Sequence, residues 1–502
     1  MAISTIGQNG LAVPLITSAD ASISGLTVGK GAGSSFYNTV VGAGALAANT
    51  TGIINTAVGS TNGSNATLSS NTTGNGNNAF GAAALGKNTT ANQNNAFGYE
   101  ALRENTTGAN NVAVGGGALT SNTTASNNTA VGYQAGYSNT TGTDLVALGY
   151  FSAKSNTTGN QNTALGNNSL QNNSTGFALT AVGYSALIVN TGSNNTSVGA
   201  YSMQANTSGG QNTALGREAL TSNTTASYNT AVGYQAGYTN STGRVDAIGS
   251  QTLFSNTTGV ANIAIGGSYI DNIRAALYGN TTGSYNTAVG NAALAYNTTA
   301  SYNTAIGYTA GYGANGNGNI FIGYSAGYGA TTLTTGTNNT LIGYGASTSG
   351  ATDSAELVIL AGNNTTPVGK GSNTGFIFVN NGSSFGGVYQ GNNSSSWSTT
   401  SDRRLKKNIV DNTVGLDAIS KIQVRNFEYR TADEVTELEP QNAIDIKGVQ
   451  LGAIAQELQA ILPDCVKTES TGVMSVDTTN LTWYLINAVK ELKAEIDQLK
   501  GK

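Results

Sequence analysis

Close variants of Asn128-Thr129-Ala130-Val131-Gly132 recur along most of the chain, and this repetition indicates how the chain folds. Eleven of the seventeen spacings between the glycines that close these stretches are 17 residues, and three are 16. A period this regular predicts a solenoid in which each repeat forms one coil. The closing glycines are Gly42, Gly59, Gly81, Gly98, Gly115, Gly132, Gly149, Gly166, Gly183, Gly199, Gly216, Gly233, Gly249, Gly266, Gly290, Gly307, Gly323 and Gly343.

Each repeat joins a short β-prone segment to polar turn residues, which favours a β-solenoid over a helical repeat. Asn and Gly in turns such as 139–142 supply left-handed backbone conformations. We expect two short strands and two corners in each coil, and a buried column of Ala, Val, Ile and Leu where coils stack. Because a narrow coil encloses little interior, we expect three chains to share one rod.

The density of charged residues changes near Ser401. The first 400 residues hold 17 charged side chains, whereas the last 102 hold 29. Two different kinds of polypeptide are therefore joined at this point. We expect four segments: an N-terminal attachment segment at 1–36, a repeat shaft at 37–350, a distal β-region at 351–400 and an α+β domain at 401–502.

The residue inventory excludes several classes of function. The chain has no His and one Cys, so it cannot build the usual Cys/His zinc site or a nucleophile activated by His. We expect no metal and no cofactor. The net charge of −4 argues against binding to nucleic acid. No stretch reaches 18 apolar residues and the N-terminus lacks the pattern of a secretory signal, so no membrane insertion is expected.

Aromatic residues gather in the expected distal β-region. Phe376, Phe378, Tyr389 and Trp397 are candidates for contact with a glycan or protein receptor, because exposed aromatic side chains form binding surfaces. The same residues, with Phe385, could instead form a small core shared by three chains. The sequence leaves both interpretations open.

The last 102 residues carry a second set of motifs. The segment 401–409, Ser-Asp-Arg-Arg-Leu-Lys-Lys-Asn-Ile, resembles the opening motif of the self-cleaving intramolecular chaperone domain at the C-terminus of phage tail fibres and tailspikes. Further motifs of that family follow in order at 424–429, 452–458, 462–464 and 481–500, so the resemblance covers essentially all of 401–502. The segments 391–409 and 447–451 are similar to tail-fibre proteins of marine cyanophages. The shaft repeats resemble the head repeats of trimeric autotransporter adhesins.

The resemblance to the chaperone family implies self-cleavage. Ser401 would be the nucleophile and Lys406 its partner, and the Thr400–Ser401 bond would be cut after trimerisation. In a chain without His, a desolvated Lys of lowered pKa is the remaining base. Whether Lys406 acts within one chain or across the trimer stays open. Ser401 and Asp402 are also an ordinary helix N-cap, which requires no cleavage.

The C-terminal segment predicts a coiled coil. Thr482, Leu485, Val489, Leu492, Ile496 and Leu499 are spaced 3, 4, 3, 4 and 3 residues apart. Together with the resemblance to the phage chaperone family, this spacing leads us to expect a homotrimeric tail fibre or adhesin in the virion, made in the host cytoplasm. Its N-terminus would bind a tail or baseplate protein of the virion, its receptor would be a glycan or protein of the host surface, and self-cleavage would be its only chemistry.

Two other classes of function stay open. A depolymerase of surface polysaccharide needs two facing carboxylates, and the first 400 residues contain nine acidic side chains with no obvious pair. An ice-binding array is suggested by threonines that recur in the repeats. Asn78, Asn95 and Val112 interrupt that column, whose members are Thr56, Thr129, Thr163, Thr213, Thr230, Thr287 and Thr304.

Overall fold

The structure is a computed structural model of the chain, which divides into two compact units, residues 1–400 and 401–502. The division falls where the charge density changes in the sequence. The residues described are 20–23, 26–33, 37–60, 65–268, 274–329, 332–362, 369, 371–380, 385–390, 403–431, 433–438, 447–468 and 472–501.

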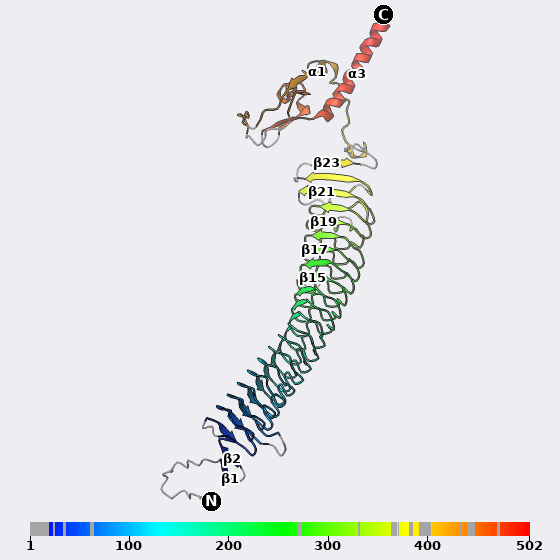
Figure 1. Cartoon of the computed structure of the whole chain (residues 1–502). Helices are drawn as coiled ribbons and strands as arrows, with labels where there is room; N and C mark the ends of the chain where they lie inside the picture. The colour runs from blue at the N-terminus through cyan, green and yellow to red at the C-terminus, as the bar shows by residue number, and fades with distance from the viewer. Residues whose placement is uncertain are drawn as a thin grey trace, which may run out of the picture. The chain divides into compact units, whose positions relative to one another are not determined.

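The first unit is a β-solenoid whose strands lie above one another like rungs (Figure 1). Each coil contributes one strand of three or four residues, and neighbouring coils pair their strands in parallel and in register, as Ala113 does with Ala130. The expectation of two strands in each coil was wrong, because turns fill the rest of the period. The strands of the repeats are β3 Thr39–Val41, β4 Thr56–Val58, β5 Asn78–Phe80, β6 Asn95–Phe97, β7 Val112–Val114, β8 Thr129–Val131, β9 Val146–Leu148, β10 Thr163–Leu165, β11 Thr180–Val182, β12 Thr196–Val198, β13 Thr213–Leu215, β14 Thr230–Val232, β15 Val245–Ile248, β16 Asn262–Ile265, β17 Thr287–Val289, β18 Thr304–Ile306, β19 Ile320–Ile322 and β20 Thr340–Ile342.

Further strands extend this sheet at both ends. β1 (Ala21–Ile23) and β2 (Leu26–Gly29) pair antiparallel with each other, and β2 pairs antiparallel with β3. β21 (Leu357–Gly362) and β22 (Gly375–Asn380) continue the parallel stack, and β23 (Phe385–Gln390) pairs antiparallel with β22. The described strands of the expected distal β-region therefore belong to the sheet of the shaft.

Side chains alternate across each strand, so in the three-residue strands only the middle residue points inward. In β8, Ala130 is fully buried, whereas Val131 is 37% exposed. The expected burial of Val, Ile and Leu was therefore wrong for most strands, and Val40, Val245 and Leu341 are exceptions. We call the outward residues that end β3 to β20 the strand face.

The interior is filled by Ala from the strands and by Leu from the turns. Leu119, four residues after Gly115, is fully buried and has a φ of 50°. Left-handed backbone at a non-glycine residue costs about 1–3 kcal/mol, and burial of the leucine offsets that cost. Turn geometry was expected from Asn and Gly, yet much of it is adopted by buried Leu.

Glycine is required where each strand ends. Gly132 has a φ of 138°, and a Cβ atom there would lie 2.3 Å from the carbonyl oxygen of Gly149 in the next coil. The backbones of neighbouring coils therefore approach too closely at this corner for any side chain. This contact explains why the closing residue of the repeat is glycine.

Two ladders of buried asparagine run through the shaft. In one, Asn105 Nδ2 donates to Asn88 Oδ1 at 3.0 Å and to the carbonyl oxygen of Gly108 at 2.9 Å. In the other, the backbone N–H of Asn111 donates to Asn94 Oδ1 at 3.0 Å. Each amide thus satisfies buried polar groups of its own coil and of the next one.

The second unit is a small α+β domain. It contains the 3-10 turn η1 (Arg403–Leu405), the helix α1 (Leu416–Ser420) and the antiparallel strands β24 (Arg425–Phe427) and β25 (Gln450–Gly452). The helix α2 (Ala455–Gln459) and the turn η3 (Pro463–Cys465) follow. The strands β26 (Val466–Thr468) and β27 (Met474–Val476) then precede the long helix α3 (Thr478–Lys500).

Candidate functional site

The C-terminal unit is held together by a small core against α3. Leu458, Leu462, Cys465 and Tyr484 are its buried members. Burial raises the pKa of the Cys465 thiol, which makes this side chain a poor nucleophile. The core therefore acts as a support for α3.

Helix α3 begins at a cap that the sequence supplies. The side chain of Asp477 accepts a hydrogen bond from the N–H of Thr479 at 3.0 Å. This bond satisfies one of the free N–H groups at the start of the helix. The helix then runs for 23 residues. One of its faces contacts the rest of the domain, and another is exposed.

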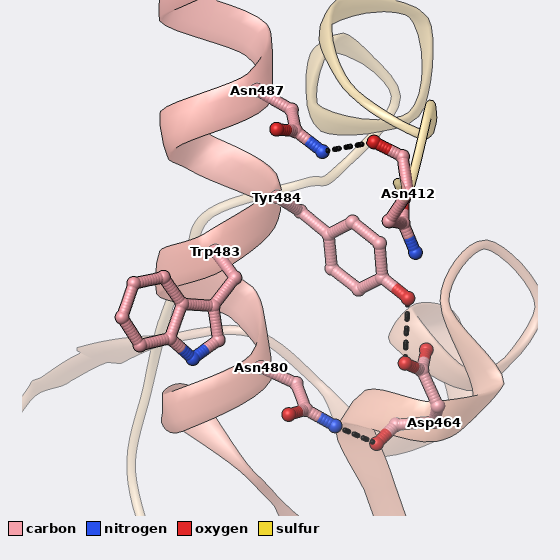
Figure 2. Close-up of a pocket in the computed structure, with 6 residues that line it drawn as sticks. All are labelled: Asn412, Asp464, Asn480, Trp483, Tyr484 and Asn487. Carbon is pink, nitrogen blue, oxygen red and sulfur yellow. Dashed lines mark hydrogen bonds between the residues drawn. The ribbon is translucent and has the colours of Figure 1, made fainter. Parts of the chain in front are cut away.

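One face of α3 binds its own domain through polar contacts (Figure 2). Asn487 Nδ2 donates to the carbonyl oxygens of Asn412 at 2.9 Å and Val414 at 3.2 Å. One turn further on, Glu491 Oε2 accepts from the N–H of Leu416 at 2.6 Å. These bonds fix the segment before α1 onto the helix.

The same face carries the bond between Tyr484 and Asp464. The Tyr484 hydroxyl donates to Asp464 Oδ2 at 2.6 Å, and this bond to a carboxylate raises the pKa of Tyr484. Asn480 Nδ2 donates to the Asp464 carbonyl oxygen at 3.1 Å. With Asn412, Trp483 and Asn487, these residues line a cavity of about 190 Å³ (Figure 2). Sequence reasoning missed this cluster because its members are far apart in the chain.

The other face of α3 is apolar and exposed in the single chain. The five apolar residues of the predicted coiled-coil seam are between 38% and 73% exposed. They are Leu485, Val489, Leu492, Ile496 and Leu499. Within this chain, therefore, the described residues leave the seam largely uncovered.

Of the predicted cleavage residues, the structure describes Lys406. Thr400 and Ser401 lie outside the described residues. Lys406 lies just after η1, in the stretch 403–414, where every residue is exposed. Its backbone N–H donates to the Arg403 carbonyl oxygen at 3.1 Å. The residues after Ser401 and Asp402 form a short 3-10 turn, whereas the N-cap interpretation expects a helix.

Of the four predicted receptor residues, the structure describes the side chain of Phe376. Phe376 is 8% exposed and belongs to the core of the shaft, so the structure disagrees with its role as a receptor contact. It pairs with Val358 in β21 and extends the column of inward residues. Phe378 and Tyr389 lie on β22 and β23, but their side chains are outside the described residues, as is Trp397.

Among the described residues, no three side chains of His, Cys, Asp or Glu gather closely enough to hold a metal ion. None of the described helices combines the length and the apolar character that crossing a membrane requires.

Comparison with known protein families identifies the C-terminal unit. Residues 401–467 match the family described as chaperone of endosialidase. The match begins at the boundary between the two units and ends within β26, so α3 lies beyond it. No curated protein and no solved structure was found to be similar to the chain. The chain therefore joins a β-solenoid to a C-terminal chaperone-of-endosialidase domain.

Proposed function

We propose that the protein is a homotrimeric fibre of the phage tail-fibre type, which attaches a virion to its host. Its residues 401–502 direct the assembly of three chains and then cut themselves from the shaft. The observation that carries this proposal is the chaperone-family match at 401–467 together with the exposed apolar seam of α3 that follows it in the same unit.

The seam supports assembly through the C-terminal unit. Its alternating spacing of three and four residues is that of helices packing along a common axis. A coiled coil of fewer than three heptads is marginal alone. The polar contacts of Asn487 and Glu491 therefore matter, because they join the helix to a folded domain that adds stability to the trimer.

A chaperone domain would solve the problem of register between three repetitive shafts. Consecutive coils are so alike that three chains could pair one repeat out of register. Starting assembly from one defined C-terminal trimer fixes the register before the repeats fold.

Self-cleavage can be written with the residues of this chain. Lys406, as a neutral amine, would take the proton of the Ser401 hydroxyl, and Ser401 Oγ would attack the carbonyl carbon of Thr400. The C–N bond would break, the amine of Ser401 would leave with a proton, and an ester would form. Water would then hydrolyse the ester, which frees the Thr400 carboxylate and restores the Ser401 hydroxyl.

The N-terminal end of the chain would attach the fibre to the virion. Residues 1–36 would bind a tail or baseplate protein, and of these 1–19, 24–25 and 34–36 lie outside the described residues. A host glycan or protein would be the receptor. With Phe376 buried, Phe378, Tyr389 and Trp397 stay as candidate contacts.

Intact-mass analysis of freshly purified protein tests the cleavage. The wild type and the control Lys407→Ala should give fragments that end at Thr400 and begin at Ser401. Ser401→Ala and Lys406→Ala should each give one unbroken chain. An unbroken wild-type chain would contradict self-cleavage and leave the C-terminal unit as a permanent clamp.

A further inference from the structure

The strand face has an unusual distribution of side-chain size. In the eighteen strands from β3 to β20, the last residue is always Val, Leu, Ile or Phe and points outward. The middle residue, which points inward, is mostly Ala, as in Ala113, Ala130 and Ala164. The larger apolar side chains of these strands are thus on the outside, the reverse of what an isolated solenoid requires.

Every coil repeats this arrangement. None of the eighteen outward residues that end these strands is buried. The more exposed ones, such as Val131, Leu165 and Leu215, have exposed fractions from 37% to 48%. Among the eighteen strands, Asp246 is the sole charged residue. A continuous, neutral, apolar stripe of this length marks a surface that binds another macromolecule.

The other sides of the coil are different. In the coil 116–132, the outward residues beyond the strand include Ser121, Thr123, Thr124 and Asn127. These side chains are small and polar. Exposed tyrosines such as Tyr133, Tyr150 and Tyr324 also lie beyond the strands, directly after the closing glycines, but they occur in only some of the coils. The strand face is therefore the side of the shaft that is apolar in every coil.

We infer that the strand face is the contact surface between the shafts of neighbouring copies of this chain. The inference rests on the proposed trimer and adds which side of the shaft is buried in it. A second copy fits because it offers the same neutral, apolar row once per coil. Three copies can turn this face toward one common axis, and homomeric interfaces have such apolar cores.

Thiol labelling of single cysteine variants tests the inference. Leu165→Cys places a thiol on the strand face, and Thr158→Cys places one on an exposed polar position of the same coil. A maleimide should react with the assembled full-length protein about tenfold more slowly at position 165 than at 158, since a partner covers the former. Ile306→Cys and Thr299→Cys repeat the comparison in a distant coil. The wild type gives the small background from the buried Cys465.

Sedimentation of the same samples separates the possible failures. Equal labelling rates in a protein of trimeric mass would overturn the inference and leave the proposed function intact. Equal rates in a monomer would overturn both. Slow labelling at 165 in a monomer would also overturn the inference, because something other than a second copy would then cover the face.

Discussion

Gly136 and Leu145 share one space in the core of the shaft. A Cβ atom at Gly136 would lie 3.1 Å from Leu145 Cδ2. In the preceding coil, the equivalent positions hold Leu119 and Asn128. Leu145 thus fills the apolar volume that Gly136 leaves empty. It also replaces the asparagine that the preceding coil has at this position of the ladder.

This pairing predicts a measurable coupling. Gly136→Leu should lower the free energy of unfolding by about 1–3 kcal/mol, because it overpacks a filled core. Adding Leu145→Asn restores the pair of the preceding coil, so the double variant should regain most of that loss. Denaturant unfolding of both single variants and the double variant gives the coupling energy. Purely additive losses would mean that the two sites do not share space.

The end of an asparagine ladder predicts a stabilising substitution. Asn297 Oδ1 is buried and has no hydrogen-bond partner among the described residues, and the next coil has Ala314 at the ladder position. Ala314→Asn would provide the missing donor and should raise the free energy of unfolding by about 1 kcal/mol. Ala314→Leu, of similar size but without a donor, is the control. Equal effects of the two substitutions would contradict the hydrogen-bond explanation.

The bond between Tyr484 and Asp464 predicts a pH dependence. Because the folded state raises the pKa of Tyr484, this contribution is complete below the ordinary tyrosine pKa of about 10 and is lost as pH rises through the folded value. Tyr484→Phe should therefore destabilise α3 by roughly 1 kcal/mol at pH 7. The gap between wild type and variant should shrink at alkaline pH, when helix melting is followed by circular dichroism. A constant gap would count against the bond.

The seam of α3 predicts a loss of assembly. Leu492→Lys places an unpaired charge where three helices would meet, and burying such a charge costs several kcal/mol. Association should weaken by at least about tenfold. Gln498→Lys adds the same charge at an exposed position outside the seam and should leave assembly unchanged. Light scattering after size exclusion compares the two, and equal masses would remove the seam from the interface.

The sequence predicted the period but not which side of each strand faces inward. In a unit such as Thr129-Ala130-Val131, two of three residues are apolar, so alternation alone does not choose between Ala130 and Val131. The packing of the coils decides, because the turn leucines already fill much of the interior and the inward position then holds Ala in most coils, although Val40 and Phe321 occupy it in two others. The asparagine ladders were also missed, since Asn in a low-complexity repeat is equally typical of exposed turns.

The sequence predicted the helix of the candidate site but not its contacts. The heptad spacing of Leu485 to Leu499 is local, and the helix over these residues follows from it. The contacts of Asn480, Tyr484 and Asn487 depend on chain segments up to 75 residues away, which local patterns do not place. The role of Phe376 was misjudged because an aromatic residue in a β-region can face either side.

The mass of the assembled protein shows whether three chains associate. Ser401→Ala keeps each full-length chain whole whatever the cleavage chemistry does, so this variant is used for sedimentation equilibrium. A homotrimer has three times the chain mass of 50.6 kDa, and this is the expected result. A particle of 50.6 kDa at micromolar concentration would contradict it.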